Sequence, residues 1–131
     1  MGKHCMLHEK FLLDRYHEAK HCGTVEGATF TTERVSPACG DKIVFSGIVR
    51  DRQLVDLRFT GEGSILSQVF ADLLCDWAIS KTVEEINALA KEDAIAMLQA
   101  DLGPTRQMTI IFVLDVLREG LNTGTDGGAG S

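Results

Sequence analysis

The hydrophobic pattern of the chain changes its period twice. Between residues 6 and 20 apolar side chains recur at helical spacing, which predicts an amphipathic helix that Gly23 ends. Between residues 24 and 60 the pattern becomes that of strands, with turn-forming residues between successive runs. The third run alternates apolar and charged residues, as is typical of a sheet with one face toward solvent. The three β-prone runs, joined by short connections, are residues 29–35, 42–49 and 53–59.

The helical period returns after the Gly-Glu-Gly sequence at residues 61–63. One wide apolar stripe predicts a helix over residues 65–77, with Ser64 as the residue at its entry. Thr82 and Glu85 then form a capping box, which predicts the start of a further helix. The stripe consists of Ile65, Leu66, Val69, Phe70, Leu73, Leu74 and Trp77.

The last part of the chain predicts a short helix and a long one. The short helix is expected over residues 92–102, and Gly103 and Pro104 end it. Residues 106–121 are apolar almost all round, which predicts a buried helix, although residues 110–113 alone also suit a strand.

This order of elements predicts an α+β domain, in which helices pack on one face of a three-stranded antiparallel sheet. An N-terminal helix precedes the sheet and a long C-terminal helix closes the domain. We expect the domain to comprise residues 1–121 and the glycine-rich residues 122–131 to form a flexible tail. The turns around Cys39 and Ser64 are then expected to lie close together.

Composition narrows the classes of function. The chain has 131 residues, 44% of them hydrophobic, and no apolar run approaches the roughly 20 residues of a membrane span. Its start lacks the basic-then-apolar order of a secretory signal, which predicts a cytoplasmic protein with its four cysteines reduced. The net charge of −6 argues against nucleic acid as a partner, because a phosphate backbone needs a basic face.

Four segments carry a resemblance to a known family. They are "LLDRYHEAKHCGTVEGA", "VSPACGDKIVF", "LVDLRFTGEGSILSQ" and "KTVEEI". Over about residues 7–121 the chain resembles the NifU/IscU-like iron-sulfur cluster assembly scaffold proteins. The resemblance implies an antiparallel sheet with helices on one side, and a cysteine desulfurase or another cluster-assembly protein as partner. It also implies that an iron-sulfur cluster or a zinc ion is held by three cysteines and an aspartate.

Carried over position by position, the resemblance assigns the first cysteine to Cys39 and the aspartate to Asp41. The second and third cysteines fall on Ser64 and Thr109, so two of the three thiols are missing. Thiolates are soft anionic ligands, whereas hydroxyls are hard, neutral and reluctant to ionise. Two anionic donors fall short of the four of a closed tetrahedral site. We therefore expect iron, zinc or a cluster to be held only weakly, or only between two chains of an oligomer.

Two other functions remain open. In one, the chain keeps the scaffold fold as a protein-interaction or regulatory module without metal. In the other, Cys39 is the single thiol of a sulfur acceptor, because "GSILSQVF" also resembles the SufE-like acceptors, whose reactive cysteine corresponds to Ser64. An enzyme with its own turnover is not expected, since no base-nucleophile pair or phosphate loop is visible.

The remaining candidates are local. The four histidines form two pairs of helical spacing, which predict either a chelating site for Zn²⁺, Ni²⁺ or Cu²⁺ or an ordinary solvated helix face. Cys75 lies about 16 Å along the helix from Ser64 and is expected in the core. Asp115 is either a buried functional carboxylate or a hydrogen-bonded or outward-pointing one. The histidine pairs are His4 with His8 and His17 with His21, with Cys5 and Cys22 beside them.

Overall fold

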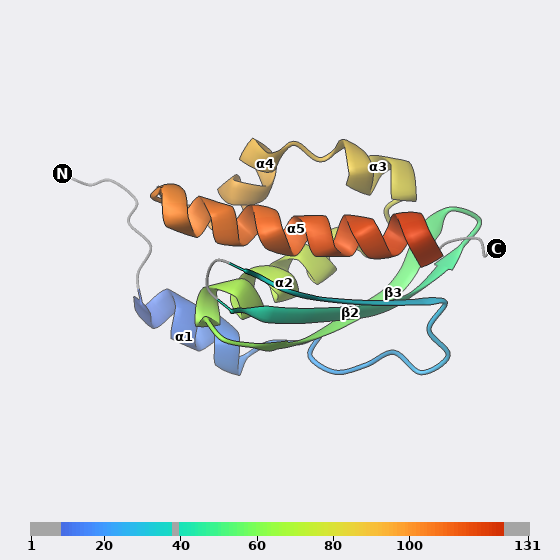
Figure 1. Ribbon diagram of the computed structural model, residues 1–131, viewed down its shortest axis with the longest axis horizontal. Helices are drawn as coiled ribbons and strands as arrows, with labels where there is room; N and C mark the ends of the chain where they lie inside the picture. The colour runs from blue at the N-terminus through green and yellow to red at the C-terminus, as the bar shows by residue number, and fades with distance from the viewer. Residues whose placement is uncertain (1–8, 38–39, 125–131) are drawn as a thin grey trace.

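The computed structural model describes residues 9–37 and 40–124, which form a three-stranded antiparallel sheet with helices (Figure 1). The sheet order β1-β2-β3 follows the chain, as a meander does. The predicted α+β class, with a first helix before the sheet and a long last helix, is confirmed. The strands are β1 (Phe30–Val35), β2 (Lys42–Arg50) and β3 (Gln53–Glu62). The helices are α1 (Glu9–His17), α2 (Ile65–Ala78), α3 (Val83–Ala88), α4 (Lys91–Ala96) and α5 (Pro104–Gly124).

The core lies between one face of the sheet and the helices α2 and α5. Phe45 on β2 stands opposite Phe59 on β3, and both rings are buried on this face. Helix α2 packs mainly on β3, whereas α5 runs across β1 and β2 and also contacts α2. Figure 1 shows α3 and α4 beside α5, on its side away from the sheet. The apolar stripe predicted for residues 65–77 therefore faces the core, as its period requires.

A glycine lets α5 approach the sheet closely. A Cβ atom on Gly120 would lie 2.7 Å from Cγ2 of Thr32 and 2.9 Å from Cδ2 of Phe30, both on β1. Real Cβ atoms do not come this close, so only glycine fits at this crossing. The contact fixes one end of α5 on β1, and the other end of the helix lies over the end of the sheet where the candidate site is found.

Helix α1 ends at His17, and the prediction that it continues toward Gly23 is wrong. The backbone N–H groups of Lys20 and His21 donate instead to Oδ1 of Asp72 on α2, over 3.0 and 2.9 Å. Next to them, Cys22 forms an isolated parallel bridge with Phe59. These partners lie 37 residues away for Cys22 and 51 to 52 residues away for His21 and Lys20, so the local pattern gives no sign of them.

Two boundaries near α4 and α5 also differ from the prediction. Helix α4 ends at Ala96 rather than near residue 102, because the chain turns back through Gln99, whose φ is +55°. Pro104 was predicted only to end the helix before it. It is the first residue of α5, where its missing N–H and fixed φ suit the first helical turn.

Helix α5 settles the ambiguity of residues 110–113 in favour of a helix. It extends to Gly124, three residues beyond the domain boundary predicted from the sequence, and residues 125–131 lie outside the described part of the chain. The prediction of a helix buried all round is wrong, because Met108 is 60% exposed and Asp115 is also exposed. None of the described helices combines the length and hydropathy that crossing a membrane demands.

The predicted capping box at α3 is confirmed. Thr82 Oγ1 accepts a hydrogen bond from the Glu85 N–H over 3.0 Å, and Glu85 Oε1 accepts one from the Thr82 N–H over 2.8 Å. The other end of α3 is held by Arg118 of α5, whose guanidinium donates to the carbonyl groups of Ile86 and Leu89. Helix α3 is thus fixed at both ends although it is only six residues long.

Candidate functional site

A tight turn between β1 and β2 carries the first of the predicted site residues. The Ser36 N–H donates to the Asp41 carbonyl over 2.7 Å, and the Gly40 N–H donates to the Ser36 carbonyl over 2.8 Å. Gly40 has a φ of +77°, in the left-handed region that glycine adopts without strain. Cys39 belongs to this turn in sequence but lies outside the described residues. The turn places Asp41 at the entry of β2.

Asp41 and Ser64 are joined by two hydrogen bonds. Oδ1 of Asp41 accepts from the Ser64 N–H and Oδ2 accepts from the Ser64 hydroxyl, each over 2.8 Å. Asp41 is 3% exposed, so both of its oxygens are occupied within the protein. The carboxylate also lies at the N-terminus of α2, where the helix dipole favours negative charge.

Ser64 caps α2, as its predicted place at the helix entry requires. Its backbone is extended, with φ −66° and ψ 145°, and its Oγ accepts a hydrogen bond from the Ser67 N–H over 3.3 Å. The same hydroxyl therefore donates to Asp41 and accepts from the first turn of α2. This double use of one hydroxyl links the β1-β2 turn to the helix.

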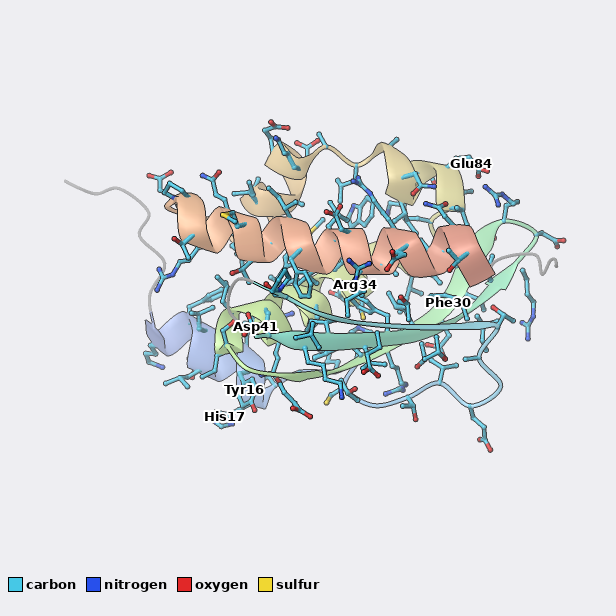
Figure 2. The ribbon with its side chains drawn as sticks, in the orientation of Figure 1. Tyr16, His17, Phe30, Arg34, Asp41 and Glu84 are labelled. Carbon is cyan, nitrogen blue, oxygen red and sulfur yellow. The ribbon has the colours of Figure 1, made fainter. Side chains whose placement is uncertain are left out.

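A groove of about 840 Å³ opens beside this pair. Asp41 and Ser64 line it at the end of the sheet nearest α1, where Figure 2 places Asp41. Thr109 lines the same groove from α5, so the structure brings these three predicted positions to one place. The Thr109 hydroxyl donates to the Thr105 carbonyl over 3.4 Å and is not hydrogen-bonded to Asp41.

Most of the groove is apolar, and the sequence pattern does not predict it. One wall is α1, through Leu12 and Leu13, and the opposite wall is α5. The groove depends on how two helices distant in sequence pack, and a hydrophobic pattern shows only that each helix has an apolar side. The other apolar lining residues are Pro37, Ile65, Leu66, Met108, Ile111 and Phe112.

Two charges of α5 also border the groove. Asp115 is exposed, which answers the question left open by the sequence: it points outward and is not a buried carboxylate. Arg106 is exposed as well, and its guanidinium group forms no hydrogen bond or ion pair with any of the described residues.

A buried carboxylate holds α1 in place as a groove wall. Asp72 on α2 is 1% exposed and accepts from the Arg15 guanidinium over 3.1 Å as well as from the two backbone N–H groups after α1. Arg15 lies on the same helix as Leu12 and Leu13. Asp72 therefore sets the position of the wall although it does not line the groove.

The other candidate residues do not join the groove. His17 and His21 do not share a helix turn, because α1 ends at His17, so the predicted chelating geometry is wrong for this pair. The His21 ring instead lies 3.3 Å from Oδ1 of Asp76, and the His17 ring packs edge-on against Tyr16. His4, His8 and Cys5 lie outside the described residues.

Cys75 is fully buried, which confirms its predicted place in the core. Burial, and to a smaller extent the nearby charge of Asp72, raises the pKa of the Cys75 thiol well above its ordinary value. A thiol that stays protonated is neither a metal ligand nor a nucleophile.

The donors in the described part of the chain do not make a closed metal site. No three histidine, cysteine or acidic side chains gather there in a way that suits an ion. We call the part of the groove lined by Asp41, Ser64 and Thr109 the corner. Its described donors are the Asp41 carboxylate, whose oxygens are both hydrogen-bonded, and the hydroxyls of Ser64 and Thr109. This set does not fit a resident zinc ion or cluster, which needs several deprotonated soft ligands.

An antiparallel sheet covered on one face by helices, with Asp41 and Ser64 paired at the entry of the second strand, places the chain in the class of small α+β domains. Residues 7–123 match the family described as NifU-like N terminal domain. The chain therefore belongs to the NifU-like N-terminal domain family, as the resemblance implied.

Individual relatives agree with this membership. Over 87 residues the chain is 33% identical to the iron-sulfur cluster assembly scaffold protein IscU of Thermotoga maritima. The match covers 66% of this chain and 61% of that protein, so the chain spans less than two thirds of its relative.

Solved structures share the fold. A NifU-like protein (N-terminal) from Brucella abortus superposes with a TM-score of 0.70 at 17% identity, over 88% of this chain and 92% of that one. A protein of Fervidobacterium islandicum AW-1, assigned as a cluster assembly scaffold for the SUF system, gives 0.61 at 21% identity, over 90% and 96%. At such identities the likeness concerns the fold alone.

Proposed function

We propose that this chain serves in iron-sulfur cluster assembly as a scaffold-like domain that contributes only part of a cluster site. Cys39 and Asp41 supply the anionic donors of one chain. Iron or a cluster, as the cargo of assembly, is then held weakly by one chain, or more firmly when two chains or a partner protein share it. The domain has no turnover of its own, and a cysteine desulfurase is the expected source of sulfur.

The observation that carries this proposal is that Asp41, Ser64 and Thr109 line one groove. These are the positions that the family resemblance assigns to the ligand corner, and they come from three separate segments of the chain. Hydroxyls at two of them weaken the site, because Ser and Thr ionise far less readily than cysteine. Membership in the NifU-like family supports the assembly role.

A second function, a protein-interaction module without metal, is favoured by a different observation. Both oxygens of Asp41 accept hydrogen bonds from Ser64, so metal binding by this carboxylate first requires that these bonds break. The groove beside it is mainly apolar, and exposed apolar grooves mark interaction sites on protein surfaces.

Anaerobic reconstitution of the untagged protein tests the proposal. Ferrous iron, cysteine and a cysteine desulfurase are added, and the charge-transfer absorption of an iron-sulfur cluster is followed. We expect a chromophore that Cys39→Ala abolishes. Cys22→Ala is the matched control, because Cys22 is an exposed free thiol outside the groove, and it should leave the absorption unchanged.

The other outcomes separate the alternatives. A chromophore that survives in Cys39→Ala contradicts the proposal. Colourless protein with sulfane sulfur on Cys39 identifies a single-thiol sulfur acceptor. Protein that takes up neither iron nor sulfur, but binds the desulfurase, is an interaction module.

A further inference from the structure

The groove between α1 and α5 has exposed apolar side chains on both of its walls. Met108 of α5 is 60% exposed and Leu13 of α1 is 40% exposed, and both line the groove. Exposed apolar side chains that border a groove mark a surface on which another chain segment docks.

The segment that leads into α1 is attached beside this groove. Residues 1–8 lie outside the described part of the chain and connect directly to Glu9, the first residue of α1. Leu12, which lines the groove, comes three residues later, about 4.5 Å further along the helix. Figure 1 shows α1 and the first turns of α5 at the same end of the molecule.

The length of this segment suits the groove. The α5 wall runs from Thr105 to Asp115, which is about 15 Å of helix. Extended chain from Glu9 back to Lys3 reaches about 20 Å. Residues 3–8 are therefore long enough to follow the whole wall without a turn.

The side chains of the segment suit the walls. Consecutive side chains of an extended segment point to opposite sides, so Met6 and Leu7 can each face one apolar wall. Lys3 is the one lysine, arginine or acidic residue among residues 1–8. Asp115 borders the groove, is exposed, and forms no ion pair with any of the described residues. The opposite charges of Lys3 and Asp115 favour a segment that runs along the groove toward Asp115.

We propose that residues 1–8 dock in the groove as an extended strap between α1 and α5. Met6 and Leu7 of this strap lie on the apolar walls, and Lys3 lies beside Asp115. Because the strap belongs to the same chain, its effective concentration at the groove is roughly millimolar, which favours it over a free partner.

The strap controls access to the corner. Asp41, Ser64 and Thr109 line the groove that it fills, so it has to leave before iron or another protein reaches them. This consequence rests on the proposed function, whereas the docking of the strap does not.

Fluorescence of anilinonaphthalene sulfonate, a dye that brightens on exposed apolar surface, tests the proposal on the untagged, iron-free protein. Met6→Asp and Leu7→Asp, made singly, should each release the strap and raise the fluorescence several-fold. The dye is an anion, so an added carboxylate by itself would lower the signal. Val55→Asp makes the same kind of change at a 42% exposed position on β3, outside the groove, and should leave the signal unchanged. Circular dichroism melts check that each variant folds.

A charge swap tests the direction of the strap. Lys3→Glu sets two carboxylates against each other and should raise the fluorescence, by less than Leu7→Asp does because exposed ion pairs are weak. Adding Asp115→Lys should return the signal to the parent level.

Alkylation reports on the strap itself. Iodoacetamide should modify Cys5 more slowly than the exposed Cys22 of the same molecule, and Leu7→Asp should bring the two rates together.

The remaining outcomes overturn the proposal. Parent and variants that are equally bright have an open groove. Parent and variants that are equally dim have another occupant, and a signal that falls as protein concentration rises identifies it as a second copy. A charge swap that leaves the fluorescence high also contradicts the strap. Because no iron is present, this test and the Cys39 chromophore test can fail independently of each other.

Discussion

Gly63 and Asp41 approach so closely that a Cβ atom on Gly63 would lie 2.2 Å from Oδ1 of Asp41 and 3.0 Å from its Cα atom. Gly63 also has a φ of +109°, a conformation that other residues adopt only with strain. The last glycine of the Gly-Glu-Gly sequence therefore makes room for the carboxylate that binds Ser64. The motif and the aspartate form one packed unit.

Gly63→Ala should destabilise the protein by about 2–4 kcal/mol, because the methyl group displaces Asp41 and the backbone stays strained. Urea unfolding followed by circular dichroism measures the change. Gly103→Ala is the matched control, since a Cβ atom there meets nothing within 4 Å and the φ is not positive, and we expect it to cost no more than about 1 kcal/mol, the cost of alanine before the first turn of α5. Equal effects of the two substitutions would contradict the packing argument.

Asp72→Asn should destabilise the protein by about 3 kcal/mol. The buried carboxylate accepts from Arg15 and from two backbone N–H groups, and its neutral replacement leaves the partly buried guanidinium without a counter-charge. The comparison is Asp76→Asn on the same helix. Among the described residues its exposed carboxylate is paired with His21 alone, and the substitution should cost less than about 1 kcal/mol.

Hydrogen exchange gives a second readout of the same change. Asp72→Asn should speed exchange in α1 and at Lys20 and His21, and leave β2 protected. Uniform loss of protection over the whole chain would show that Asp72 has no special role in holding α1.

The sequence allowed prediction of those parts of the fold that depend on local chemistry. The three strands follow from alternation and turn residues, and the cap at Thr82 follows from the spacing of hydroxyl and carboxylate. The end of α1 was not predictable, because the backbone N–H groups of the residues that follow it donate to Asp72 and Phe59, far along the chain.

The candidate site also has a part that the sequence predicted and a part that it did not. Asp41 and Ser64 were recognisable because the motifs around them have a characteristic spacing, and the structure places them in direct contact. The groove beside these two residues was not recognisable from the sequence, since its walls are two helices about ninety residues apart in sequence. Tertiary packing of this kind leaves no periodic signal in either helix.

Cys75 should make the stability of the protein fall as the pH rises above about 9. Its pKa in the folded state is raised above the ordinary value of 9.0 by burial, so the unfolded chain loses the thiol proton first. The stabilisation is complete below pH 9 and decreases at higher pH, by at most about 1.4 kcal/mol per pH unit. Urea unfolding at pH 8 and pH 10 should show a larger decrease for the parent than for Cys75→Ala.

Alkylation checks the same thiol independently. Under native conditions iodoacetamide should modify the exposed Cys22 and spare Cys75, as peptide mass mapping can show. Modification of both thiols at equal rates would mean that Cys75 is accessible and that its pKa is not raised by burial.

Restoring thiols at Ser64 and Thr109 should create zinc binding at the corner. In the parent the Ser64 hydroxyl lies 2.8 Å from Oδ2 of Asp41, so a thiolate there would stand beside the carboxylate, and Thr109 lines the same groove. With Cys39 the double variant Ser64→Cys, Thr109→Cys has three thiols and one carboxylate, which is the number of donors that a tetrahedral zinc site needs. Competition with a chromophoric chelator should give a zinc affinity at least about a hundredfold above that of the parent. Each single variant is a control and should bind zinc less tightly than the double variant. If the double variant binds no more zinc than the parent, the positions assigned to the second and third cysteines are wrong.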